Sequence, residues 1–118
     1  MDADEPRIVR ERIPLAAVAR LASLRFGDMV KAVVDVRRGI MAIGGELHSD
    51  EEAMLIESGS VQGDIWGINL YPDEANDAWI EFDSMINLRP SQGNRTRGVD
   101  DQDLQLRIRS VVDSLVDR

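Results

Sequence analysis

The sequence predicts a single α+β domain, residues 7–118, built on a mostly antiparallel sheet of about five strands with helices packed on one face. Two regions rich in β-branched and aromatic residues predict two hairpins, in residues 29–45 and 64–88. The last segment, residues 100–118, has apolar residues at helical spacing and predicts an amphipathic helix. The chain of 118 residues is long enough to complete one core. The expected element order is β-α-β-β-α-β-β-α.

The chain is expected to enter this domain through a short tail and an edge strand. Residues 1–6 are polar and end in a proline, which predicts a flexible tail. Residues 7–13, RIVRERI, place apolar side chains among charges and predict a short strand near an edge of the sheet. Since an exposed edge strand can pair across a two-fold axis, a homodimer is one expected assembly.

Three helices are expected from apolar spacing and capping residues. Residues 15–26 are rich in helix formers, follow a proline and precede a glycine. Ser49 and Glu52 form an S-x-x-E capping box, which predicts a second helix with Ser49 at its N-cap. Asp100 or Asp101 is expected to cap the C-terminal helix.

The composition argues against several classes of protein. The absence of cysteine removes disulfides, thiolate metal sites and cysteine nucleophiles. The formal net charge of −8 argues against general binding to nucleic acids or anionic membranes, because both need a cationic face. The start of the chain has no signal-peptide pattern, and no stretch approaches the roughly 18 apolar residues of a membrane span, so a cytoplasmic location is expected. No motif of known chemistry is present, and no cofactor is expected.

An arginine- and asparagine-rich stretch, NLRPSQGNRTRG, follows the most strand-like segment of the chain. Alternation along residues 78–88 places two acids, Glu81 and Asp83, on the polar face of that strand. The stretch then supplies glycines and side-chain donors suited to a carboxylate or phosphate group. The expected ligand-binding residues are Asn87, Arg89, Gln92, Asn94, Arg95 and Arg97. The alternative is that these arginines pair with acids of the protein itself.

His48 is the only histidine, so any histidine-dependent proton transfer must use it. A small hydrolase-like enzyme is therefore one alternative, with His48 and an acid, Glu46, Glu81 or Asp83, in acid-base roles, and with Glu81 and Asp83 as the predicted catalytic carboxylates. Another alternative is an acidic binder of a divalent cation such as calcium, with the PDEAND loop, residues 72–77, as an oxygen-rich segment. No calcium-loop motif is present, and no metal-binding residue is assigned.

Four strings are spread along the chain, FGDMVKAVVDV, RGIMAIGGELHSD, DIWGINLYP and IEFDSMINLRPSQGNRTRGVDD. Together they resemble a family of short bacterial conserved hypothetical proteins that is classed as a domain of unknown function. The resemblance extends from about Ile8 to Val116. It implies a single stand-alone domain and brings no established activity or catalytic residue.

The residues themselves favour a small binding or regulatory domain whose loop, residues 87–98, recognises a small anionic ligand. The hydrolase-like enzyme and the calcium binder stay open as alternatives. The three hypotheses differ in where His48 and the arginines must lie, and that is a question for the structure.

Overall fold

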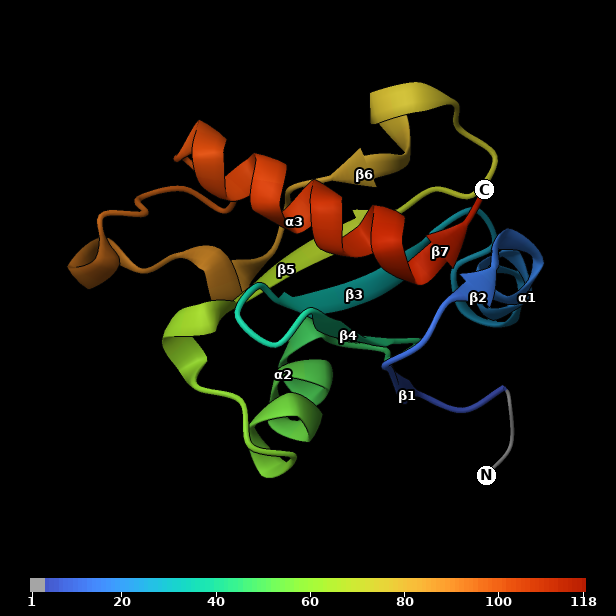
Figure 1. Cartoon of the computed structure of the whole chain (residues 1–118), viewed down its shortest axis with the longest axis horizontal. Coiled ribbons are helices and arrows are strands. Elements are labelled where there is room, and N and C mark those ends of the chain that lie inside the picture. The colour runs from blue at the N-terminus through green and yellow to red at the C-terminus, as the bar shows by residue number, and fades with distance from the viewer. Residues whose placement is uncertain (1–3) are drawn as a thin grey trace.

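Residues 4–118, the part of the chain that the computed structural model describes, fold around a five-stranded antiparallel sheet (Figure 1). In spatial order the strands are β1 (Arg7–Val9), β4 (Ile40–Ile43), β3 (Val30–Asp35), β5 (Ile65–Leu70) and β6 (Ile80–Glu81). Each strand runs antiparallel to its neighbours. The predicted α+β class and antiparallel sheet are confirmed.

Within the same residues the chain forms three α-helices and a second, two-stranded sheet. The helices are α1 (Leu15–Arg25), α2 (His48–Glu57) and α3 (Gln102–Leu115). In the second sheet, β2 (Ile13–Pro14) pairs in parallel with β7 (Val116–Asp117). This pairing joins the segment before α1 to the end of α3 (Figure 1).

The helices lie on both faces of the main sheet. Val34 of β3 belongs to a core cluster with Val18 of α1 and Ile108 of α3. Val33 points to the opposite face and packs in a second cluster with Leu55 of α2. Figure 1 shows α3 and α2 on opposite sides of the strands. The expectation of helices on one face therefore holds for α1 and α3, whereas α2 covers the other face.

The segment predicted as a long strand, residues 78–88, is a strand for only two residues, β6. The chain then leaves the sheet, and Met85–Asn87 form a short 3₁₀ helix. Ser84 stabilises this turn, because its Oγ accepts a hydrogen bond of 3.3 Å from Ile86 N. The alternating polar face predicted for this segment is therefore wrong beyond Glu81.

The start of α2 also differs from its prediction. Leu47 occupies the N-cap position with extended backbone, and no side chain caps the helix. Ser49 lies inside the first turn, so its prediction as the N-cap is wrong. Glu51 takes the role expected of Glu52, since its Oε2 accepts a hydrogen bond of 2.9 Å from Gly45 N, before the helix. The prediction for α3 is confirmed, since the Asp101 side chain accepts a hydrogen bond from the backbone of the first turn.

The predicted tail is described only in part. Residues 1–3 lie outside the described residues, and the flexible tail stays a prediction. Asp4 is the first described residue, and its Oδ1 lies 2.6 Å from Nε of Arg20. In residues 4–118 no helix has the length and apolar character needed to cross a bilayer.

Candidate functional site

The two asparagines of the predicted ligand loop are buried connectors. Asn94 is only 4% exposed; its Nδ2 donates to Asn87 O and Gly98 O over 2.7 and 2.8 Å. Its Oδ1 accepts a 2.8 Å hydrogen bond from Asp100 N. Asn87 binds both backbone groups of Gly67, accepting from the N–H over 2.8 Å and donating to the carbonyl over 2.9 Å. These amides hold the loop to itself and to β5.

Arg89 has a similar internal role. Its Nε donates to Ile86 O over 2.9 Å, and its two Nη groups donate to Gln62 O and Ile65 O over 2.9 and 2.6 Å. The guanidinium also stacks on the Trp66 ring, 4.5 Å from the ring centroid. The planar donors of this arginine therefore join the loop to the start of β5.

The two remaining arginines of the loop have different surroundings. Nε of Arg97 lies 2.7 Å from Oδ1 of Asp83, and both side chains are about half exposed. In the described residues the Arg95 guanidinium has neither a hydrogen bond nor an ion pair, although its backbone N–H donates to Asp100 Oδ2 over 2.8 Å. Arg89 also lies near an acid, since its Nη2 is 3.8 Å from Oε2 of Glu52. Two of the three predicted arginines therefore pair with acids of the protein, one of them inside the fold, and the third is exposed.

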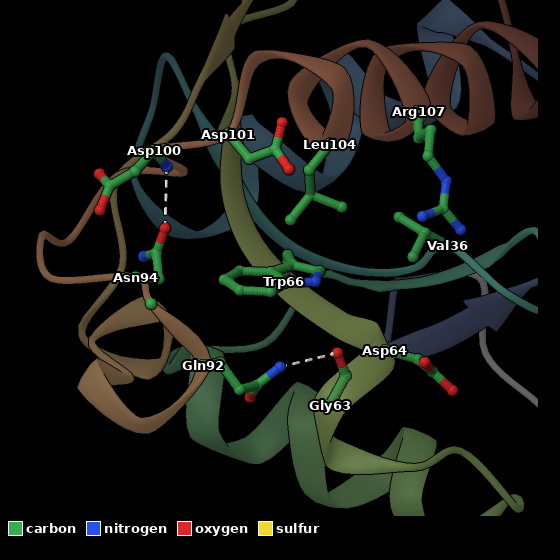
Figure 2. A pocket seen from close by; sticks show the side chains of 11 residues that line it. Val36, Gly63, Asp64, Trp66, Gln92, Asn94, Asp100, Asp101, Leu104 and Arg107 are labelled. Carbon is green, nitrogen blue, oxygen red and sulfur yellow. Dashed lines mark hydrogen bonds between the residues drawn. The ribbon is translucent and has the colours of Figure 1, made fainter.

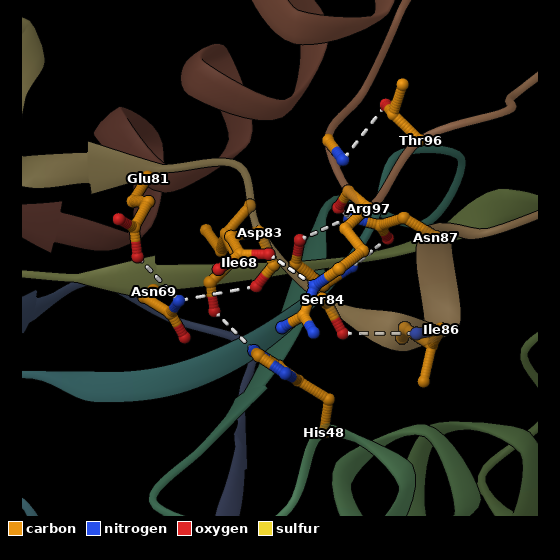
Figure 3. A network of polar contacts seen from close by, with 12 residues as sticks. His48, Ile68, Asn69, Glu81, Asp83, Ser84, Ile86, Asn87, Thr96 and Arg97 are labelled. Carbon is orange, nitrogen blue, oxygen red and sulfur yellow. Dashed lines mark hydrogen bonds and ion pairs between the residues drawn. The ribbon is translucent and has the colours of Figure 1, made fainter.

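His48 is held by the backbone of β5. Its Nε2 lies 2.7 Å from Ile68 O, and because a carbonyl can only accept, Nε2 carries the proton and Nδ1 is left as an acceptor (Figure 3). The side chain is 9% exposed, and burial lowers the pKa of His48 below its ordinary value of 6.5. His48 is therefore mostly neutral at neutral pH.

The predicted catalytic carboxylates are engaged elsewhere. Oε1 of Glu81 accepts from Asn69 Nδ2 over 2.8 Å and from the Tyr71 hydroxyl over 3.1 Å. Asp83 is paired with the arginine described above. Among residues 4–118 no hydrogen bond or ion pair joins His48 to either acid. The structure thus brings the three predicted catalytic residues into one region without linking them directly (Figure 3).

A small cavity of about 170 Å³ lies beside His48, between the start of α2 and the turn after β6. We call it the His48 pocket; its lining residues are Lys31, Leu47, His48, Ser49, Ser84, Met85, Ile86 and Arg97. Figure 3 shows the Arg97 and His48 side chains reaching toward the same space. The cavity therefore combines one imidazole, two cations and two hydroxyl groups.

Gly67 allows the sequence to build this pocket. A side chain at Gly67 would place its Cβ 2.5 Å from Ser84 Cβ and 3.1 Å from Ile86 Cγ1, so only glycine lets the turn approach β5 this closely. The hydrogen bonds from Asn87 then hold the turn against the strand. Ser84 is almost fully buried and lines the pocket because of this close approach.

A second cavity of about 260 Å³ lies over the Trp66 indole, near the start of α3 (Figure 2). We call it the Trp66 pocket. Two predicted ligand residues line it, but Gln92 Nε2 donates to Gly63 O over 3.3 Å and Asn94 is bonded as described above. The charged lining residues are Asp64, Asp100, Asp101 and Arg107. In residues 4–118 no group of three or more His, Asp or Glu side chains is placed to hold a metal ion. Residues 4–118 therefore offer the calcium-binder alternative no cluster of carboxylate ligands.

Comparison with known proteins gives a family and no activity. Searches of the curated proteins and of the solved structures found no match. The model of one family, described as "Protein of unknown function (DUF5674)", matches residues 7–115, which is nearly the whole chain. This confirms the resemblance to a family of unknown function: the protein belongs to the DUF5674 family.

Proposed function

We propose that the protein binds a small oxyanion, the phosphate or carboxylate group of a small molecule, in the His48 pocket. The single observation that carries the proposal is that Lys31 and Arg97 line one cavity in a chain with a formal net charge of −8. Cationic side chains that line a cavity together with hydroxyl groups suit a phosphate or carboxylate oxygen. Of the loop residues that the sequence nominated, Arg97 is the one in this proposed contact.

Both cations keep donors for a ligand. Arg97 uses Nε to pair with Asp83, and since a guanidinium has five N–H donors, its Nη groups remain available. Lys31 has no carboxylate within ion-pair distance among residues 4–118, and its Nζ lies 5.2 Å from the centre of the Phe26 ring. A bound oxyanion would give Lys31 an ion-pair partner that the described residues do not supply.

His48 and the start of α2 add hydrogen-bonding groups of both kinds. The first N–H groups of a helix have no intrahelical acceptor, and no side chain caps α2. Asp50 also lies in the first turn, but it does not line the pocket. His48 Nδ1 is an acceptor, so the site suits an oxyanion that also carries a proton or a hydroxyl group, such as monohydrogen phosphate.

The test is an NMR titration of the ¹⁵N-labelled protein with inorganic phosphate and with acetate at constant ionic strength. We expect shifts of the amides at the start of α2, and a dissociation constant that rises about 5- to 20-fold in Lys31→Gln and in Arg97→Gln, because each loses a charge-assisted hydrogen bond. Arg95→Gln is the matched control, since it removes the same charge from the same loop outside the pocket.

Two outcomes would contradict this proposal. Binding that weakens equally in Arg95→Gln and Arg97→Gln would show only a general response to net charge. Amide shifts that avoid the start of α2 would place the ligand elsewhere. The titration is carried out at neutral pH, because a protonated His48 would add a third positive charge and mask the loss of Lys31 or Arg97.

A hydrolase-like enzyme is a second candidate, favoured by the orientation and protonation state of His48. Hydrogen bonding to Ile68 O orients the ring, and burial keeps His48 neutral, as a general base at neutral pH must be. The pocket holds two hydroxyl groups, on Ser49 and Ser84. Turnover of p-nitrophenyl phosphate or p-nitrophenyl acetate that disappears in His48→Gln would support this candidate; turnover unchanged in His48→Gln would exclude a role for the histidine.

A further inference from the structure

A hollow lined by three large apolar side chains and one ion pair adjoins the His48 pocket. It has a volume of about 370 Å³, and its lining residues are Leu24, Arg25, Phe26, Glu46 and Leu47. Leu47 lines both cavities, so the hollow and the pocket are neighbours along one surface. Leu24, Phe26 and Leu47 are 50%, 41% and 54% exposed, which is a concentration of large apolar side chains at one place.

The charged residues of the hollow already have partners. Nε of Arg25 donates to Gly44 O over 2.7 Å, and its Nη1 lies 3.2 Å from Oε1 of Glu46. The hollow therefore offers a ligand its three apolar side chains and no unsatisfied charge. Lys31 connects the two cavities, because it lines the His48 pocket while its ammonium group lies over the Phe26 ring.

From this arrangement we infer that the ligand of the His48 pocket is a small amphiphile, a phosphate or carboxylate that carries a short alkyl or aryl group. The oxyanion lies between Lys31 and Arg97, and the apolar group covers Leu47 and enters the hollow beside Leu24 and Phe26. This inference rests on the proposed function and adds the chemical class of the ligand. The His48 pocket is smaller than a typical small-molecule site and the hollow is at the lower end of the usual range, which limits the apolar group to a short chain or one ring.

The experiment measures the affinity of a series of n-alkyl phosphates, from methyl to hexyl, by calorimetry at constant ionic strength. Burying a methylene group lowers a dissociation constant by up to about fourfold, so a hollow that is open on one side gives about two- to fourfold for each added carbon. Hexylammonium carries the same tail with the opposite charge and is expected to show no binding.

A matched pair of variants locates the tail. Leu24→Ser removes an apolar side chain of the hollow from α1, and Leu106→Ser makes the same change on α3, where the side chain is 64% exposed and lies outside both cavities. We expect Leu24→Ser to flatten the dependence on chain length while leaving the affinity for inorganic phosphate within about twofold. Leu106→Ser should keep the full dependence.

The outcomes separate the inference from the proposed function. Inorganic and methyl phosphate that bind at the start of α2, with no gain for longer chains, would overturn the inference and leave the proposed function intact. A gain with chain length that survives in Leu24→Ser would also overturn it, because the tail would then lie elsewhere. Failure of every phosphate and of acetate to bind would overturn both.

Discussion

Gly67→Ala is the most direct test of how the pocket is built. The added Cβ would lie 2.5 Å from Ser84 Cβ and 2.6 Å from Ser84 Oγ, which is closer than real Cβ atoms approach, and 3.1 Å from Ile86 Cγ1, which is a tight contact. The turn cannot simply move away, because Asn87 holds it to both backbone groups of Gly67. Either the strand and turn separate and these hydrogen bonds lengthen, or the side chains are compressed.

The cost follows from these two responses. Overpacking a core contact costs about 1–3 kcal/mol, and a buried hydrogen-bonding group left without its partner costs a further 1–3 kcal/mol or so. A partial response of both kinds gives about 3 kcal/mol in the free energy of unfolding. At roughly 4 °C for each kcal/mol in a domain of this size, the melting temperature of Gly67→Ala should fall by about 12 °C.

Urea unfolding followed by circular dichroism measures this cost, with a lower midpoint and an unchanged slope as the expected result. Gly63→Ala is the matched control, because its Cβ would meet no atom closer than Gln92 Nε2 at 3.5 Å, and it should change stability by less than about 0.5 kcal/mol. Ser84→Gly removes the two atoms that would lie closest to the new Cβ, so the double variant should recover at least about 1 kcal/mol as coupling energy. Equal stability of Gly67→Ala and Gly63→Ala would refute the reasoning.

Two further predictions concern buried charge. Burial raises the pKa of Glu51 well above its ordinary 4.5, so the folded protein holds a proton that the unfolded chain releases, and stability falls as the pH rises from 4.5 through the folded pKa. Glu51→Gln resembles the protonated form of the side chain. Its melting temperature should equal that of the wild type below pH 4.5 and exceed it at pH 8. A difference in melting temperature that is the same at all pH values would contradict this prediction. Arg89→Lys keeps the charge but loses the planar set of donors, and should lower the free energy of unfolding by about 2 kcal/mol in urea titrations while phosphate affinity stays within about twofold. A large loss of phosphate affinity without a loss of stability would instead make Arg89 a ligand residue.

Much of the fold could be predicted from the sequence, because local patterns and tertiary packing agree there. The apolar spacing of residues 102–115 and the cap at Asp101 both specify α3. The predominantly apolar run in β3 is typical of a strand that is covered on both faces of the sheet. Residues 32–35 are all fully buried, as expected of a strand covered on both faces, and this explains why α2 lies opposite α1 and α3.

The failures occur where a side chain overrides the local pattern. Residues 78–88 alternate like a strand, but the Ser84 hydroxyl bonds to the backbone two residues later and turns the chain. No local pattern shows that the turn will rest on Gly67, since that contact joins residues far apart in the sequence. Ser84 could not be predicted as a lining residue for the same reason, and no local pattern around Lys31 indicates that it lines a cavity.

The loop illustrates why donors in a sequence do not by themselves define a site. Asn87, Asn94 and Arg89 have the chemistry of ligand-binding residues, but their hydrogen atoms go to backbone carbonyls that any chain of this shape must satisfy. A sequence displays the donors, whereas the acceptors become visible only when the chain is folded. The charge of the loop therefore overstates the number of groups that it can offer to a ligand.

The internal hydrogen bonds have a consequence for the proposed binding of an oxyanion. A flexible arginine loses side-chain and loop entropy when it binds a ligand, and that loss weakens the affinity. Here Asn87 donates to the backbone oxygen of Arg97 over 3.0 Å, and Asp83 orients its guanidinium through Nε. In the proposal, the loop contributes to binding mainly by fixing one arginine at the pocket in advance. Asp83→Asn should therefore weaken phosphate binding even though it removes a negative charge from the rim of the site, whereas a purely electrostatic effect would strengthen it.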